Sequence, residues 1–414
     1  MGEKMRILFL IPHFPTVSET FIVNQMVYLL DKGHDISILS WSKPDHPLHS
    51  KVTQYNLIKK AVYVDIPQSP LERLKHFCQV CLKGFNFRYL KTLNIFRYKA
   101  GALKLNVFYR AIAMEKLNGD FDIVHSHFAV MSEFFFEGKL LGFFKGSKLV
   151  VTFHGYDMAP KDLILNRKRY RQIFRQNTVV TVGNEFGKSL VSAICPGYTN
   201  IELLPMGLDT EYYRPVQPKS DSPEIKVIFC GRLVALKGPD IVVEVANALI
   251  NKRGISKVKF NIVGDGEEFE KLQNLIRKYH LENYVNLLGV KTQDQIIDIM
   301  NDSDIFLLPG IVDVDGRAET QGLVIQEAQA MCIPVIVSDA GGMKYGVIDG
   351  VNGFIVKERD IETIVNKIEM LANDADLRNR MGNQAREYVV NEFDSRVLGG
   401  KLESLYKKQL GRVN

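Results

Sequence analysis

Short apolar runs alternate with segments of helical periodicity along the whole chain, and this alternation most restricts the possible folds. Near the start, residues 6–12 (RILFLIP) and 35–41 (DISILSW) are strand-like, and residues 18–33 between them have helical periodicity ending at Gly33. The later runs FDIVHSHF, SKLVVTFHG and NTVVTVGN are apolar, β-branched and closed by His, Gly or Asn. Buried parallel strands have this composition, so the pattern predicts βαβ units in an α/β fold.

The same alternation begins again in the second half, where EIKVIFCGR, KVKFNIVGDG, SDIFLLPG and CIPVIVSDAGG are strand candidates. With 414 residues the chain is too long for one core of the usual size. A Pro/Ser/Lys-rich linker near residues 207–224 divides it. We therefore expect two doubly wound, Rossmann-like domains, residues 1–206 and 207–394, facing a cleft at their strand ends, with a helix at about 395–414 packing back on the first.

The composition gives expectations about compartment. No apolar run reaches 18 residues, and the N-terminus lacks a cleavable signal pattern, so we expect a cytoplasmic protein. The five cysteines are odd in number and scattered, which argues against a disulfide framework. Cys78 and Cys81 form a lone CxxC, for which neighbours on a helix are favoured over a metal or redox pair.

The stretch FCGRLVALKGPD follows the first strand of the second half. It contains neither GxGxxG nor a Walker lysine pattern, but it places Arg232 directly after a buried strand and Lys237 before a helix. Two cations at a strand end suit a diphosphate, because Arg offers a planar fork of donors and Lys a mobile charge. The alternative is a pair of solvated surface cations.

Two carboxylates, Glu319 and Glu327, lie in the stretch AETQGLVIQEAQAM. On one helix they would stand about 12 Å apart along the axis, which excludes a tight catalytic dyad. The free backbone N–H groups of Gly322, Leu323 and Val324 at a helix start attract anions. The arrangement fits a diphosphate that bears a sugar on each side. One of the two glutamates would accept hydrogen bonds from the hydroxyls of one sugar, and the other glutamate from those of the second sugar.

Together, GRLVALKG, IVGDGEE, SDIFLLPG, the two glutamates and PVIVSDAGG…IDGVNGFIV resemble the family-4 retaining glycosyltransferases of the two-Rossmann GT-B fold. MGLDTEYYRP resembles the segment that enters the second domain in that family. FPTVSETFI and DVDGRAETQG resemble the subgroup of colanic acid and related exopolysaccharide assembly. The resemblance implies an acceptor-binding first domain and a nucleotide-sugar-binding second domain.

The resemblance also implies roles for single residues. Arg232 and Lys237 would hold the donor diphosphate, Glu327 the ribose hydroxyls and Glu319 the donor sugar. The base would meet the backbone near Val290, and His154 of VTFHGYD would face the donor sugar. The implied donor-binding set is Gly231, Arg232, Lys237, Gly264, Val290, Glu319, Gly322, Leu323, Val324 and Glu327, and the implied catalytic set is His154, Arg232, Lys237 and Glu319.

The acceptor side departs from the family pattern, because PHFPTVSET stands where many relatives have a Gly-Gly loop. Ser18 or Thr20 would cap the following helix or bind ligand, with capping favoured. His127 is a further acceptor-side candidate. With His125 it forms an i, i+2 pair for which a packed strand end is favoured over zinc.

The resemblance implies catalysis by the leaving diphosphate itself, which accepts the acceptor hydroxyl's proton on the same face while cations and the helix start stabilise its charge. A glycosidase-like nucleophile would need two carboxylates about 5 Å apart. We expect no cofactor and no metal, so Asp313 and Asp315, a D-x-D, are not predicted metal ligands.

The first half of the chain is basic, with 27 Lys and Arg against 17 Asp and Glu in residues 1–210. Residues 71–116 carry ten basic and two acidic side chains, interleaved with aromatic ones. This segment is either a solvated face over a core or a surface for anionic lipid headgroups. Nucleic acid is not an expected partner, because no reading motif is present.

These features predict a retaining, metal-independent glycosyltransferase that moves a sugar from a nucleotide diphosphate sugar to a glycan or lipid-linked glycan, at the inner face of a membrane. The alternatives are a GT-B synthase acting on a soluble sugar or sugar phosphate, and a non-catalytic nucleotide-sugar-binding subunit.

Overall fold

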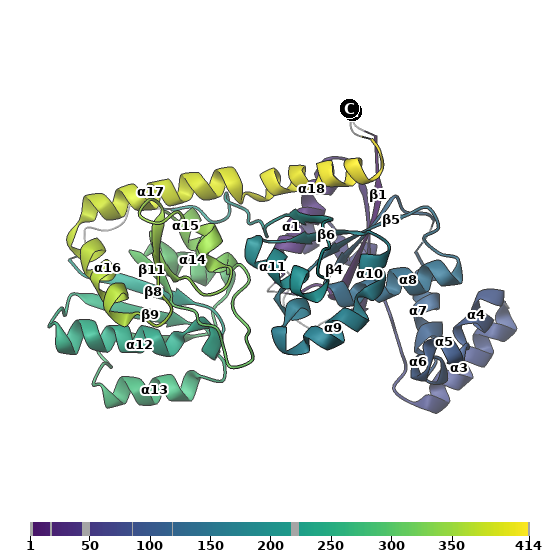
Figure 1. The fold of residues 1–414 in the computed structure, drawn as a ribbon, viewed down its shortest axis with the longest axis horizontal. Helices are drawn as coiled ribbons and strands as arrows, with labels where there is room; N and C mark the ends of the chain where they lie inside the picture. Colours follow the sequence, from purple (N-terminus) through teal and green to yellow (C-terminus); the bar gives the residue numbers. More distant parts are fainter. Residues whose placement is uncertain are drawn as a thin grey trace.

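The computed structural model describes residues 3–16, 19–43, 50–84, 86–117, 119–216 and 223–412. The first part of the chain forms a seven-stranded parallel sheet in the order β3-β2-β1-β4-β5-β6-β7 (Figure 1). Its strands are β1 Arg6–His13, β2 Asp35–Ser42, β3 Ala61–Tyr63, β4 Ile123–His127, β5 Lys148–Thr152, β6 Val179–Val182 and β7 Ile201–Leu203. Its helices are α1 Thr20–Asp31, α2 Ser50–Gln54, α3 Pro70–Lys83, α4 Phe87–Thr92, α5 Ile95–Tyr98, α6 Ala100–Leu103, α7 Asn106–Glu115, α8 Ser132–Leu141, α9 Leu163–Arg169, α10 Arg171–Arg175 and α11 Glu185–Ile194.

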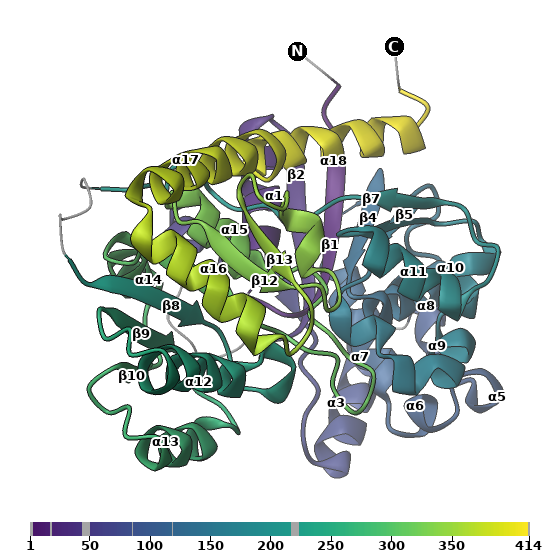
Figure 2. The same cartoon turned by 60° about the vertical axis from the view of Figure 1, so that its left-hand side comes forward.

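The second part forms a six-stranded parallel sheet in the order β10-β9-β8-β11-β12-β13 (Figure 2). Its strands are β8 Ile225–Cys230, β9 Val258–Val263, β10 Val285–Gly289, β11 Ile305–Leu308, β12 Val335–Ser338 and β13 Gly353–Val356. Its helices are α12 Pro239–Asn247, α13 Phe269–Lys278, α14 Gln293–Asn301, α15 Leu323–Ala330, α16 Ile361–Asn373 and α17 Ala375–Glu392. The predicted pair of doubly wound domains is confirmed.

The strand β1 shows how the sequence builds the first domain. Leu8 and Leu10 point into one core, while Ile7, Phe9 and Ile11 point into the core on the opposite face. Because a strand turns alternate side chains to opposite faces, a continuous apolar run suits a sheet that helices cover on both sides. The second domain has its own core around β8, β11 and β12.

The last helix, α18 Ser395–Gln409, belongs to the core of the first domain although it follows the second (Figure 1). Its Leu398, Leu402 and Tyr406 are buried in the same cluster as Ile7 and Phe9. The chain therefore crosses between the domains twice.

The two crossings are hydrogen-bonded to each other. Leu208 N–H donates to the Phe393 carbonyl at 3.1 Å, and Ser395 N–H donates to the Leu208 carbonyl at 2.8 Å. Residues 217–222 of the expected linker lie outside the described residues.

The basic and aromatic segment at 71–116 forms α3 to α7, of which α3 to α6 make a lobe beside the first sheet (Figure 1). Phe77, Tyr89 and Phe108 pack toward the core, whereas Phe96 is fully exposed. In α3 the apolar side chains of Leu71, Leu74 and Leu82 follow helical spacing and are all exposed. No helix among the described residues is both long and apolar enough to cross a membrane.

Candidate functional site

Three glycines end neighbouring strands of the second sheet and bring their backbones close together. Gly231 follows β8, Gly264 follows β9 and Gly289 ends β10. Gly264 has φ +136°, and a Cβ there would lie 1.9 Å from the Gly231 carbonyl oxygen. Only glycine fits at that position, so this edge presents bare backbone to a ligand. Val290, the expected neighbour of the base, follows Gly289 and is 74% exposed.

Lys237 and Glu319 form an ion pair at this edge. Lys237 ends the short helix η5 (Ala235–Lys237), and its Nζ lies 2.5 Å from Glu319 Oε2, with both side chains largely buried. Burial acts to raise the pKa of Glu319, but Lys237 and the nearby Arg232 outweigh it, so the pKa lies below its ordinary value. The site thus holds a fixed carboxylate beside two cations.

The helix α15 begins at Leu323, four residues after Glu319. Its N-cap is Gly322 with φ +74°, where a Cβ would lie 3.2 Å from Glu319 Cγ. Ile325 N–H donates to the Gly322 carbonyl, whereas the N–H groups of Leu323 and Val324 have no carbonyl of an earlier helical turn to donate to. Leu323 packs against the cores of both domains. The predicted anion cradle therefore lies where the two domains meet.

Glu327 lies one turn further along α15 and contacts the hydroxyl of Tyr213. Burial raises the pKa of Glu327 to about 7, although Tyr213 and Lys237 both act to lower it. The two glutamates of the motif thus have opposite shifts, because Glu319 has a direct cationic partner and Glu327 has a neutral one.

On the first domain, three histidines lie side by side at the ends of β4 and β5. His127 Nδ1 is 3.3 Å from His154 Nε2, and the rings of His125 and His127 are 4.2 Å apart. His154 is partly exposed toward the cleft, whereas His125 and His127 are fully buried. His127 therefore does not reach the surface of the cleft in this structure, contrary to the expectation that it lies on the acceptor side.

The loop before α15 contacts the first domain through side-chain amides. Asn184 Nδ2 donates to the Thr320 carbonyl at 2.6 Å and to the Gly342 carbonyl at 3.3 Å. Gln321 exchanges two hydrogen bonds with the backbone of Met206, each 2.8 Å long. A small pocket lies between the domains here, lined among others by His154, Gly183, Met206, Thr320 and Gln321.

Sequence reasoning did not select Asn184, Gln321 or Tyr213. The sequence did contain one indication that Asn184 lies at the cleft. It stands at the end of the apolar run NTVVTVGN, and residues that follow a parallel strand lie at the edge of the sheet where ligands bind. Gln321 and Tyr213 lie within the stretches DVDGRAETQG and MGLDTEYYRP, but nothing in those stretches singles them out. Only the three-dimensional contacts of Gln321 with Met206 and of Tyr213 with Glu327 identify them.

Two acceptor-side candidates, Ser18 and Thr20, remain. Ser18 lies outside the described residues. Thr20 is the first residue of α1 rather than its cap and lines a second pocket between the domains with Lys51, Tyr212 and Tyr213.

The D-x-D residues form contacts within the protein. Asp313 accepts hydrogen bonds from the backbone N–H groups of Asp315 and Arg317 and from the Arg317 side chain, while Asp315 pairs with Lys161 of the first domain at 2.8 Å. Both carboxylates thus support the loop. Within the described residues no group of three His, Cys, Asp or Glu side chains is arranged to hold a metal ion.

Comparison with known proteins follows the domain division. Residues 18–212 match the family model of Glycosyltransferase Family 4, and residues 214–388 match that of Glycosyl transferases group 1. The chain is 28% identical to the putative colanic acid biosynthesis glycosyltransferase WcaL of Escherichia coli K12, over 97% of this chain and 99% of that one. It is 26% identical to the amylovoran biosynthesis glycosyltransferase AmsK of Erwinia amylovora, over 98% and 100% of the two chains.

A third relative has a more specific name. It is the UDP-Gal:alpha-D-GlcNAc-diphosphoundecaprenol alpha-1,3-galactosyltransferase of Escherichia coli, 28% identical over 72% of this chain and 77% of that one. Among solved structures, a glycosyltransferase from Rickettsia africae matches with a TM-score of 0.73 and 20% identity over 100% of both chains. Anabaena HepE in complex with UDP-glucose matches with a TM-score of 0.70 and 17% identity, over 98% and 100% of the chains. The predicted GT-B fold is confirmed.

The amide of Asn184 provides a test of the contact between the domains. In Asn184→Asp the oxygen that caps α11 by accepting from Gly187 N–H remains, but a carboxylate oxygen replaces the donor that faces two carbonyls. Losing this buried donor costs about 1–3 kcal/mol, so we expect the domains to separate and the radius of gyration in small-angle X-ray scattering to rise. Asn200→Asp, which alters an amide contact within the first domain, is the control. Scattering identical to that of the unmodified protein would contradict the assignment.

Proposed function

Because the chain is a glycosyltransferase, with a family 4 domain followed by a group 1 domain, we propose that it transfers a sugar from a nucleotide diphosphate sugar to a lipid-linked glycan in exopolysaccharide assembly. In this proposal the transfer retains the anomeric configuration and needs no metal ion. The observation that carries this proposal is the grouping of Arg232, Lys237 and Glu319 at the start of α15, opposite His154 across the domain contact.

The proposed donor site holds the diphosphate by charge. Lys237 has three N–H donors, so it can keep its bond to Glu319 while it donates to a phosphate oxygen. Arg232 is exposed at the same strand end, and the amides of Leu323 and Val324 open α15. Positive charge at this place stabilises a leaving diphosphate, which supports cations rather than a metal as the electrophilic groups.

The two glutamates have separate roles in this proposal. Glu319, ionised beside Lys237, accepts hydrogen bonds from hydroxyls of the transferred sugar, and Glu327 accepts them from the ribose. Neither acts as a nucleophile. The acceptor hydroxyl gives its proton to the departing diphosphate on the same face of the sugar, so the configuration is retained and the protein supplies position and charge.

The names of the relatives support the acceptor class. Two relatives over the full length are named for colanic acid and amylovoran biosynthesis, and the name of the galactosyltransferase gives a UDP-sugar donor and a diphosphoundecaprenol acceptor. An acceptor of that kind is anchored in a membrane. The first domain of this chain would then have to approach a lipid surface.

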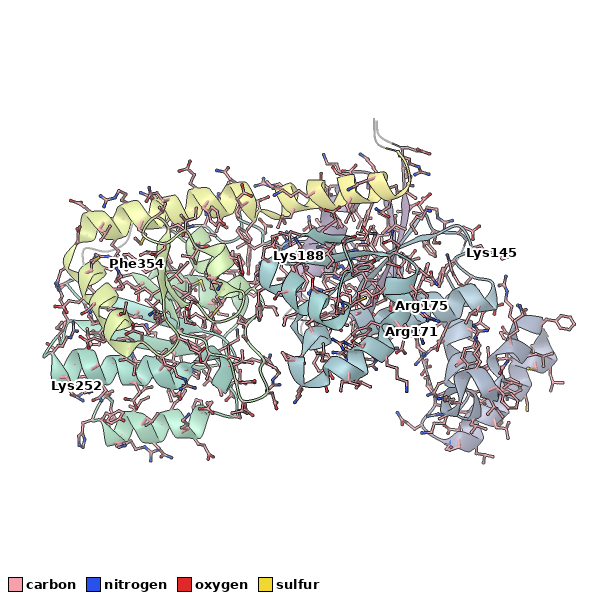
Figure 3. The ribbon with its side chains drawn as sticks, in the orientation of Figure 1. Lys145, Arg171, Arg175, Lys188, Lys252 and Phe354 are labelled. Atoms are coloured by element: carbon pink, nitrogen blue, oxygen red, sulfur yellow. The ribbon has the colours of Figure 1, made fainter. Side chains whose placement is uncertain are left out.

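The lobe of α3 to α6 has the chemistry for that approach. None of the residues of α3 is buried, and its exposed Leu71, Leu74 and Leu82 lie beside exposed Lys75 and Lys83. Apolar side chains framed by basic ones bind anionic lipid surfaces. Figure 3 also labels Lys145, Arg171 and Arg175 on the first domain, so further basic side chains lie outside the lobe.

Transfer itself tests the proposed function. With a panel of nucleotide diphosphate sugars, a lipid-linked diphosphate sugar as acceptor and EDTA present, we expect a glycan whose new linkage keeps the anomeric configuration of the donor, read by NMR coupling constants. Lys237→Ala is expected to lower kcat by about a hundredfold or more, a far larger effect than its loss of folding stability, and Lys271→Ala, at a half-exposed side chain, is the control.

Other outcomes of this assay would each change the assignment. Inversion, or a strict need for a divalent cation, would overturn the proposed chemistry. Transfer only to a soluble sugar or sugar phosphate would identify a synthase, and donor binding without turnover would identify a non-catalytic subunit.

The raised pKa of Glu327 predicts how donor affinity depends on pH. In this proposal the ionised carboxylate holds the ribose, and its pKa is about 7. Glu327 is therefore protonated in most molecules at pH 6 and ionised in most molecules at pH 8. Affinity for a nucleotide diphosphate sugar should therefore increase about tenfold between pH 6 and pH 8, measured by isothermal titration. Glu327→Gln should bind more weakly and lose this dependence. An unchanged pH profile in the variant would remove the ribose role.

Vesicle binding tests the lobe. We expect the protein to sediment with phosphatidylglycerol vesicles and not with phosphatidylcholine vesicles, and to be released by high salt. A variant with Leu74→Asp and Leu82→Asp should bind about tenfold more weakly or worse, because it places charge in the apolar stripe. Met370→Asp on α16, 44% exposed in the native protein, is the control. Equal sedimentation of the lobe variant would contradict the membrane role.

A further inference from the structure

We propose that Arg386 of α17 is a positioning residue for the donor: it ties residues 208–213, which enter the second domain, to the end of α15 and so holds the Tyr213 hydroxyl against Glu327. The inference rests on the proposed function, in which Glu327 accepts hydrogen bonds from the ribose. It adds a residue from a helix that carries none of the donor motifs.

Arg386 donates to three backbone carbonyls from two segments far apart in the sequence. Its Nη1 donates to the Tyr213 carbonyl at 3.0 Å and also to the Ala330 carbonyl. Its Nη2 donates to the Thr210 carbonyl at 3.3 Å. Ala330 ends α15, where the last carbonyls have no later helical turn to accept from. Because a guanidinium presents its donors in a rigid planar fork, this one side chain sets the separation of the two segments.

The separation that Arg386 sets is the one that the Tyr213 side chain spans. Glu327 lies three residues before Ala330 on α15, which is less than one helical turn. The Tyr213 hydroxyl is hydrogen-bonded to Glu327, and Tyr213 is only 6% exposed in the core of the second domain. Tyr213 is thus attached to α15 twice, through its carbonyl by Arg386 and through its hydroxyl. A shift of its backbone would move the hydroxyl away from the carboxylate.

Neighbouring residues of the segment are attached elsewhere. Thr210 Oγ1 donates to Asp394 Oδ2 at 2.5 Å, at the second crossing between the domains. The Tyr212 hydroxyl donates to Asp294 Oδ1 at 2.6 Å, on α14. These bonds fix the segment to other elements, whereas the bonds of Arg386 lead to the helix that carries the proposed ribose ligand.

The ionisation of Glu327 reports on this contact. Glu327 is faced by Tyr212 and Tyr213, by Cys230 at the end of β8 and by the cation Lys237. Burial raises the pKa of both phenols and raises that of Cys230 to about 12, so none of these three groups titrates between pH 6 and pH 8. A hydrogen bond from a phenol favours the ionised carboxylate, so loss of the Tyr213 contact raises the pKa of Glu327 above about 7.

Carbon NMR of the Glu327 carboxyl tests the positioning without any substrate. In protein labelled with ¹³C-glutamate, the Glu327 signal is assigned by its loss in Glu327→Gln, and its shift against pH gives the titration midpoint. We expect the midpoint to rise by about one pH unit in Tyr213→Phe, which removes the hydroxyl, and by a similar amount in Arg386→Met, which keeps the hydroxyl but frees its backbone. An unchanged midpoint in Arg386→Met would overturn the inference.

Two further variants separate positioning from charge and from general support of the fold. Arg386→Lys keeps the charge but not the fork, so we expect the same rise, and a midpoint equal to that of the unmodified protein would contradict it. This variant also carries the test if Arg386→Met does not fold. Arg378 is the matched control, because it lies on the same helix and its Nη1 donates to the Leu371 carbonyl at 2.6 Å. Arg378→Met should leave the midpoint unchanged, and an equal rise there would reduce Arg386 to a support of α17.

Isothermal titration with UDP and with GDP connects the positioning to donor binding. With a midpoint one pH unit higher, the ionised fraction of Glu327 at pH 7 falls from about a half to about a tenth. We therefore expect the nucleotide to bind about fivefold more weakly to Arg386→Met and Tyr213→Phe at pH 7, and equally well at pH 9. A loss that persists at pH 9 would contradict the inference.

The two measurements also distinguish failure of the inference from failure of the proposed function. A raised midpoint with unchanged nucleotide affinity at pH 7 would remove the ribose role of Glu327, while Arg386 would still position Tyr213. An unchanged midpoint would remove the role of Arg386 whatever the donor assays show.

Discussion

Parallel pairing of the strands is the constraint on which the rest of the molecule depends. All strand pairs in the described parts of both sheets are parallel, so the carboxyl ends of neighbouring strands share one edge. The three glycines of the second sheet and the histidines of the first lie at such edges. Each group comes from loops far apart in the sequence, and the sheet, not local sequence, brings its members together.

The site itself shows how one environment gives two carboxylates different states. Glu319 and Glu327 are both removed from water, which favours the protonated form. Direct pairing with Lys237 reverses this for Glu319, whereas the Tyr213 hydroxyl is too weak a partner to reverse it for Glu327. The same principle keeps the three histidines of the first domain neutral, because in the part of the chain that the structure describes no carboxylate offsets their burial.

Most of the fold was predictable, because long apolar runs mark central strands. The edge strands Ala61–Tyr63 and Ile201–Leu203 were missed, since they are short and only partly buried. For the candidate site, local motifs selected Arg232, Lys237 and the start of α15, and the structure brings these residues together. Asn184 and Tyr213 depend on which loops of distant segments meet, and this information is not local. Some aromatic side chains of residues 71–116 are buried in the core and others are exposed. Composition alone does not predict which of them are buried.

The position of α18 has a consequence for how the protein is made. A ribosome completes the entire second domain before it synthesises Leu398, Leu402 and Tyr406, which fill the core around β1 and β4. The second domain has all its core residues in one continuous segment and can fold as soon as it emerges. The first domain, although synthesised first, keeps an open apolar face until α18 arrives. Order of synthesis and order of completion are therefore reversed in this chain.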